Sequence, residues 1–196
     1  GISQFPSTLH PSFDSMLAKE YVNAMARRKI TVYDHDWKVT CLLCTGLPEL
    51  TEGSARFEKT PDGKDGMALD YELDPRAVWG DGTPITTKDV LFTWRMGRQG
   101  QTGILPIEFY RSAYKVEAKD DKTFTIHFDK LTFDYNAINS FDLIPAHVDQ
   151  VNFDADPVNY KNKTAFDTDT TNEALYFGPY VVSETERGSY VVLERN

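Results

Sequence analysis

Residues 79–94 read WGDGTPITTKDVLFTW and give the strongest local structural signals of the chain. Gly80 and Gly82 can adopt the positive φ angles that a tight turn requires. Thr86 and Asp89 have the spacing of a capping box, with Asp in place of the usual Glu. The apolar residues that follow recur at helical spacing. The segment therefore predicts a turn that leads directly into a capped helix.

Strand signals lie on both sides of this segment. Apolar and polar residues alternate from 67 to 73, which predicts a half-buried strand. Residues 116–128 and 180–193 each read as a hairpin, and residues 30–40 contain two short strands around a turn. These short strands and few helices do not alternate as βαβ units. We therefore expect an α+β fold with a mixed β-sheet and flanking helices.

The other segments are less regular. Ser12 or Asp14 can cap a first helix. Its apolar face is predicted to contain Met16, Leu17, Tyr21, Val22 and Met25. Residues 51–66 are polar and hold several Gly, Pro and Asp residues, so they read as a long surface loop or a loosely paired turn. Residues 149–173 are also polar and are predicted to be irregular.

The composition restricts the class of protein. The chain has 196 residues, 40% of them hydrophobic, which is enough for a packed core and argues against disorder. Its net charge is −9, and an acidic surface repels phosphate backbones, so we expect no nucleic acid as a partner. The sequence contains no run of 18 apolar residues of the kind that spans a membrane.

Cys41 and Cys44 form a CxxC motif that has three interpretations. A redox dithiol requires a thioredoxin-like strand and helix around the motif, and the neighbouring residues instead resemble a strand or buried turn. A zinc site requires a second pair of ligands, which the sequence lacks. The third interpretation is a local disulfide or two buried thiols without a function of their own, and we favour it.

Catalytic and metal-binding motifs are not recognisable. The chain has four histidines, His10, His35, His127 and His147. None lies in a known nucleophile motif, and the position of His127 in an alternating strand indicates a structural role. The acidic residues at 34–36 and 167–173 lack the ligand spacing of a metal loop and read as solvated turns. We expect no enzymatic activity, no metal and no cofactor.

Residues 76–94 resemble the peptide-binding branch of the solute-binding proteins of ABC transporters, which carry a Trp, then DGTP, then a Thr-x-x-Asp helix start. Three further segments resemble this family in the same order. They are LHP at residues 9–11, with His10 in place of the usual Asp, VEAKDDKTF at 116–124, and FGPY at 177–180 with VLERN at 192–196. The resemblance therefore extends along nearly the whole chain.

The resemblance implies the N-terminal part of a two-lobe, periplasmic-binding-protein-like fold. Residues 1–28 and 174–196 are expected to form part of lobe I, and residues 29–173 an inserted α+β subdomain. The opposing lobe is expected to be absent from this chain. The family relation also implies a periplasmic or extracytoplasmic, lipid-anchored protein whose signal peptide has been removed. Its expected partners are a peptide or other small solute and the ABC permease subunits, and the protein itself is expected to be a monomer.

The resemblance also implies where solute binds. In the family, the loop after the LHP-like segment supplies one edge of the site, which here is Phe13, Asp14, Ser15 and Met16. The segment after the DGTP helix supplies an aromatic wall, which here is Phe109 and Tyr110. Peptide main-chain groups pair with the protein backbone as an added strand. A turn and a capped helix account for residues 79–94 without a ligand, so we expect this segment to be scaffold and not part of the site.

Two other functions stay open at this stage. A hydrolase would require a convergent group of Ser, Cys, His and Asp side chains, which a nucleophile-directed probe would label. A sensory or structural module on the same fold would contact a signalling partner instead of a permease, and neighbouring genes would distinguish it.

Overall fold

The computed structural model describes residues 4–99 and 103–196. The elements in chain order are α1 (Leu17–Ala26), β1 (Thr31–Tyr33), β2 (Val39–Cys41), β3 (Ala55–Lys59), β4 (Asp65–Glu72), α2 (Thr87–Arg98), α3 (Ile107–Ser112), β5 (Ala113–Ala118), β6 (Thr123–Phe128), α4 (Ala146–Ala155), η1 (Tyr160–Asn162), α5 (Ala165–Thr168), η2 (Glu173–Leu175), β7 (Tyr180–Glu186) and β8 (Tyr190–Arg195). This arrangement confirms the α+β class.

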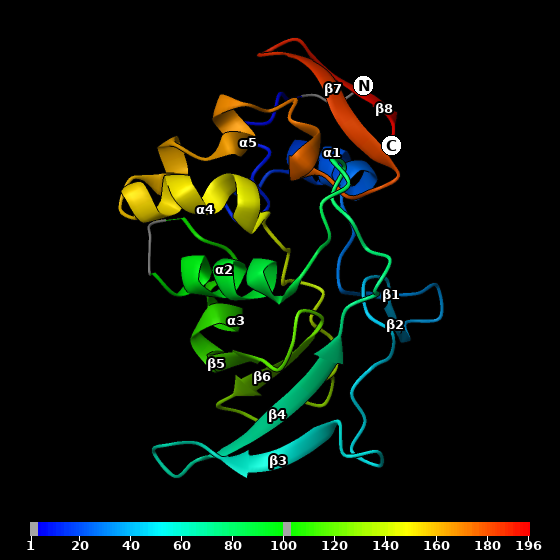
Figure 1. The fold of residues 1–196 in the computed structure, drawn as a ribbon, viewed down its shortest axis with the longest axis vertical. Helices are drawn as coiled ribbons and strands as arrows, with labels where there is room; N and C mark the ends of the chain where they lie inside the picture. Colours follow the sequence, from blue (N-terminus) through cyan, green and yellow to red (C-terminus); the bar gives the residue numbers. More distant parts are fainter. Residues whose placement is uncertain (1–3, 100–102) are drawn as a thin grey trace.

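A four-stranded sheet with the order β3-β4-β6-β5 lies at one end of the molecule (Figure 1). All its pairings are antiparallel. Helices α2 and α3 pack against β5, and α4 packs on α2. The hairpin β7–β8 lies beside α1 at the opposite end, where the C-terminus is found (Figure 1). The pairings of β1 with β2, β5 with β6 and β7 with β8 confirm the three predicted strand pairs.

The turn and helix of residues 79–94 form as predicted. Gly82 has a φ of 84°, and the side chains of Thr86 and Asp89 complete the capping box of α2. The N–H of Gly80 donates to the carbonyl of Tyr176 at 2.7 Å. A carboxylate oxygen of Asp89 also accepts the backbone N–H of Ala146 at 2.8 Å. The segment thus joins α2 to α4 and to the approach to β7.

Of the two predictions for residues 51–66, the surface loop is wrong and the paired turn is closer, because Ala55–Lys59 forms the edge strand β3 and pairs with β4. Its register with β4 runs from Ala55 opposite Leu69 to Lys59 opposite Asp65. An edge strand has one neighbour and one solvated side, so its sequence can be polar without losing its place in the sheet. Residues 149–173 are more regular than predicted as well, since they hold most of α4 together with η1 and α5.

Helix α1 forms where it was predicted, but the prediction of its buried face is wrong. Leu17, Tyr21 and Met25 are exposed. The residues of the helix that face inward are Ala18, Lys19, Val22, Asn23 and Ala26. Neither Ser12 nor Asp14 caps the helix, because its N-cap is Met16, which makes no side-chain capping bond.

Arg27, directly after α1, explains part of this orientation. Its guanidinium is buried and donates to the carbonyl of Leu175 at 2.8 Å and to that of Leu143. The rings of Phe166 and Phe177 lie 5.2 and 5.0 Å from the guanidinium carbon, a distance at which cation–π attraction is significant. Carbonyls and aromatic faces thereby replace the water that this buried cation has lost.

Cys41 and Cys44 are joined by a disulfide, with their Cα atoms 5.1 Å apart. Cys44 also forms an isolated antiparallel bridge with Leu73 at the end of β4. The disulfide is therefore a local link between the β1–β2 pair and the main sheet. This result confirms the interpretation of the CxxC motif as a local disulfide.

A chain of buried polar side chains anchors the segment before α1. Nδ1 of His10 accepts the N–H of Ser12 at 3.1 Å, so its proton sits on Nε2, which donates to the hydroxyl of Tyr160 at 3.3 Å. That hydroxyl donates to Asp149, which also accepts the hydroxyl of Thr164 at 2.6 Å. Burial, with two nearby cations, holds the pKa of His10 well below its ordinary value, so the ring is neutral.

Gly178 provides a test of the packing between α1 and β7. A Cβ at this position would lie 2.4–2.6 Å from the backbone atoms of residues 25–27, which cannot move independently of the helix. We expect Gly178→Ala to lower the free energy of unfolding by about 3 kcal/mol in urea titrations. Gly46 has open space around its Cβ position, so Gly46→Ala should change the free energy of unfolding by less than about 0.5 kcal/mol. Equal effects of the two substitutions would contradict this packing.

His10 predicts a pH dependence of stability. Its folded-state pKa lies below the ordinary 6.5, so below that pH the unfolded chain binds a proton that the native chain does not. The free energy of unfolding should therefore decrease as the pH falls from about 6.5 to 5, by up to about 1.4 kcal/mol per unit. His10→Gln should remove this decrease, and His35→Gln, at an exposed ring, should retain it. A wild-type profile in the His10→Gln variant would exclude this assignment.

Candidate functional site

The predicted site loop, residues 13–16, lies between the His10 network and the start of α1. Phe13 is fully buried and packs its ring 4.3 Å from that of His10. Asp14 has a φ of 51°, which is unusual for a residue other than glycine. Ser15 is exposed, and Met16 is half-buried. The loop therefore turns one side chain into the core and presents its next residues at the surface.

The carboxylate of Asp14 is held by two side chains. Nζ of Lys161, from η1, lies 2.7 Å from one carboxylate oxygen, and the hydroxyl of Ser7 donates to the other at 3.1 Å. The hydrogen bond from Lys161 is the main reason that the pKa of Asp14 is lowered. The same ammonium lies 5.9 Å from the ring centre of Phe13. Asp14 and Lys161 thus form a charged pair at the mouth of the loop.

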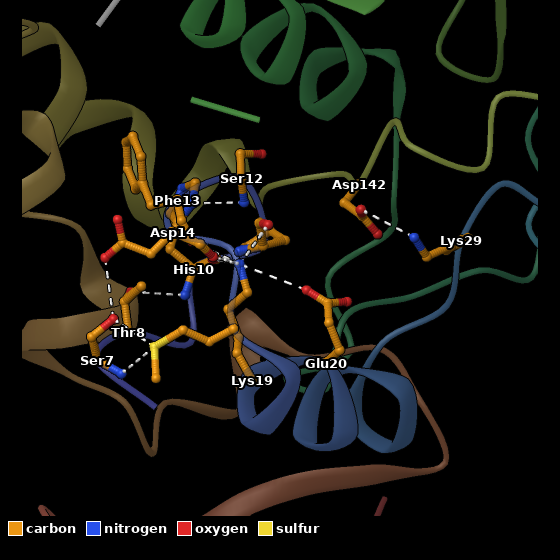
Figure 2. Close-up of polar contacts among 12 residues, drawn as sticks. Ser7, Thr8, His10, Ser12, Phe13, Asp14, Lys19, Glu20, Lys29 and Asp142 are labelled. Carbon is orange, nitrogen blue, oxygen red and sulfur yellow. Dashed lines mark hydrogen bonds and ion pairs between the residues drawn. The ribbon is translucent and has the colours of Figure 1, made fainter. Parts of the chain in front are cut away.

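A buried lysine supports the loop from the inside. Nζ of Lys19 donates to the backbone carbonyls of His10, Phe13 and Asp14, and to that of Pro11 (Figure 2). The sequence prediction missed this residue, since a lysine in the first turns of an amphipathic helix reads as solvent-exposed. No local pattern in the sequence would have identified it.

The segment just before the second predicted pair, Phe109 and Tyr110, contacts the loop through backbone atoms. The N–H of Leu105 donates to the carbonyl of Ser12 at 2.8 Å, and Phe13 forms an antiparallel bridge with Ile104. The structure therefore places residues 104–105 directly beside residues 12–13.

Phe109 and Tyr110 themselves lie in α3, which follows this contact in the chain. Tyr110 is buried in the core, and its ring fills the space above Gly97. Phe109 is half-buried, stacks on Phe141 with ring centres 5.0 Å apart, and lines a cavity of about 250 Å³ with Met67 and other residues. Their role as an aromatic wall for solute stays a prediction.

A cavity of about 480 Å³ lies next to Asp14. Its walls come from residues 5–9, 161–170 and 185–191, so the N-terminal loop, the η1–α5 segment and the β7–β8 hairpin all contribute. Asp167 and Arg187 add a second pair of opposite charges to the wall. Desolvation there raises the pKa of Asp167. The cavity offers both hydrogen-bond donors and acceptors, and it is large enough for a small organic solute.

Histidines and acidic groups outside the cavity have structural partners. His127 lies in β6 between the carboxylates of Glu58 and Glu117, at 2.8 and 3.1 Å. His147 lies 3.1 Å from Asp81 in the turn before α2. Within residues 4–99 and 103–196, no group of three or more His, Cys, Asp or Glu side chains is placed to hold a metal ion. No helix in these residues is long and apolar enough to cross a membrane.

Three comparisons identify related proteins. A sequence profile described as "Bacterial extracellular solute-binding proteins, family 5 Middle" matches residues 56–196. A binding protein of Brucella melitensis is 30% identical over 128 residues, which are 65% of this chain and 19% of that protein. The chain thus spans about a fifth of the length of this relative.

Two solved structures share the fold. The oligopeptide-binding protein of Thermus thermophilus, complexed with a pentapeptide, superposes with a TM-score of 0.80 at 24% identity over 99% of this chain and 36% of its own. The oligopeptide-binding protein AppA of Bacillus subtilis, complexed with a nonapeptide, gives a TM-score of 0.77 at 21% identity over 100% and 35%. The match of the family profile to most of the chain is decisive: the chain belongs to the bacterial extracellular solute-binding proteins of family 5.

Proposed function

We propose that this chain forms one wall of the solute cleft in the extracytoplasmic receptor of an ABC importer, and that its solute is a peptide or a similar small molecule. The observation that carries the proposal is the position of Asp14, paired with Lys161, beside a cavity of about 480 Å³. Membership of a solute-binding family supports it. Two proteins that share the fold were solved with peptides bound, which favours a peptide solute.

Binding in this proposal occurs by closure of two lobes over the solute, and a membrane permease recognises the closed form. Residues 1–28 and 174–196 form part of lobe I, and residues 29–173 form an inserted subdomain. The contacts at the end of α1 support this division, since the carbonyl of Ala26 accepts the N–H groups of Phe177 and Gly178 at 3.1 and 2.8 Å. The chain acts as a periplasmic or otherwise extracytoplasmic monomer.

The proposal assigns no catalytic role to the chain. The disulfide removes Cys41 and Cys44 as free nucleophiles, and the neutral ring of His10 is enclosed in the core. Neither feature favours the alternative of a hydrolase. A sensory module on the same fold would bind solute equally well, so only the permease interaction separates it from a transport receptor.

Solute binding is tested on the full-length protein. We expect native mass spectrometry of freshly purified protein to detect a bound peptide or small solute, and calorimetry with defined peptides such as pentaalanine to give saturable binding. Release of the solute by partial unfolding and refolding should expose an empty site. Hydrolysis of the peptides during the titration would show an enzyme instead, and no binding to any peptide would refute the peptide assignment.

Lys161 should matter for this binding because it fixes the carboxylate of Asp14. We expect Lys161→Met to weaken peptide affinity about tenfold, which corresponds to about 1.4 kcal/mol. Lys163 is a matched control, since it is two residues away and pairs with Asp156 at the surface at 2.6 Å. Lys163→Met should leave the affinity unchanged. Equal affinities of the two variants would remove Asp14 and Lys161 from the site.

A further inference from the structure

Lys19 has an environment that resembles a cation-binding site. It lies in the first turns of α1, and its side chain is only 3% exposed. Its ammonium contacts four backbone carbonyls, those of Phe13 and Asp14 at 2.7 Å, Pro11 at 3.0 Å and His10 at 3.3 Å (Figure 2). An ammonium has three hydrogen-bond donors, so every donor is used and one is shared.

The charge of Lys19 is compensated by these carbonyls more than by a carboxylate. In the described part of the chain its one ion pair is with Glu20, at 3.7 Å, and the side chain of Glu20 is 55% exposed. An exposed pair at that distance contributes little. Burial lowers the pKa of Lys19, as expected for an ammonium that has lost water. The four carbonyl dipoles are therefore what solvates the buried charge.

The same contacts constrain the loop. Four carbonyl oxygens from a stretch of five residues, 10–14, converge on one point, and their dipoles would repel one another without a cation between them. The loop also holds Asp14 at a φ of 51°, a conformation that persists only where the surroundings fix it. With its carbonyls turned to Lys19, the loop directs the carboxylate of Asp14 to Lys161 and leaves Ser15 exposed.

We propose that Lys19 is a positioning residue for solute binding: its ammonium occupies the place of a bound monovalent cation, fixes the backbone of residues 10–14, and so orients Asp14 and Ser15 at the cleft. This inference rests on the proposed function, since it assigns the solute contacts to that loop. Lys19 itself does not touch solute. Its effect on affinity is exerted through the shape of the loop.

The experiment uses Lys19→Ala in the full-length protein and chemical rescue by propylammonium, which supplies the missing ammonium. Two quantities are measured, amide hydrogen exchange of residues 12–16 and the affinity for pentaalanine. We expect exchange in this loop to become at least about tenfold faster and affinity to fall at least about tenfold. Propylammonium should restore both in part. Tetramethylammonium has the same charge but no N–H donors, and it should restore neither.

Two further variants control for a general loss of structure. Lys29→Met removes an exposed lysine that pairs with Asp142 at 3.6 Å near the end of the same helix, and it should leave both quantities unchanged (Figure 2). Lys19→Gln retains part of the hydrogen-bond donor capacity of the side chain. It replaces Lys19→Ala in the comparison with the wild type if the alanine variant does not fold. Its loop exchange and affinity should lie between those of the wild type and the alanine variant.

The outcomes separate this inference from the proposed function. Wild-type exchange in the loop of Lys19→Ala, or faster exchange throughout the chain without rescue, would overturn the positioning role. If the wild-type protein binds no peptide, the peptide assignment fails, while loop exchange and its rescue by propylammonium still decide whether Lys19 fixes the loop. A loop that loosens while affinity is unchanged would also overturn the inference, because solute binding would then not depend on the loop.

Discussion

The buried guanidinium of Arg27 connects segments that are far apart in the sequence. It donates to carbonyls of Leu143 and Leu175, and it lies against the rings of Phe166 and Phe177. The preceding residue, Ala26, accepts two N–H groups from the start of the β7–β8 hairpin. The end of α1 is therefore the point where the N-terminal segment meets residues 143, 166 and 175–178, and the loop at residues 13–16 directly precedes this helix.

Lys19 on α1 and Arg27 directly after it are both buried, and two buried cations reverse the usual rule for an amphipathic helix. Each cation donates hydrogen bonds to backbone carbonyls outside α1. Lysine and arginine side chains thus act as donors to main-chain groups that need a partner when they are buried. The apolar residues Leu17 and Tyr21 face outward as a consequence.

The parts of the fold that the sequence predicts are those held by local geometry. The capped helix after residue 86, the alternation at 67–73 and the hairpins each follow from spacing or turn chemistry within a few residues. Strand β3 was missed because its place depends on β4, not on its own polar sequence. The loop at residues 13–16 was predicted as part of the site by resemblance, and this assignment stays a prediction. Its contacts with Lys19 and Lys161 come from residues 5 and 147 positions away from Asp14, which no local pattern encodes.

Two glycines in the segments that resemble the family lie where backbones approach closely. A Cβ on Gly80 would lie 2.5 Å from the carbonyl oxygen of Glu173, and one on Gly178 would meet the end of α1. These glycines are required by packing between elements, independently of the solute. The charged groups of the cavity, such as Asp167 and Arg187, lie outside these segments. Family membership therefore follows from the scaffold, whereas the function we propose assigns solute specificity to the side chains of the loop and the cavity wall.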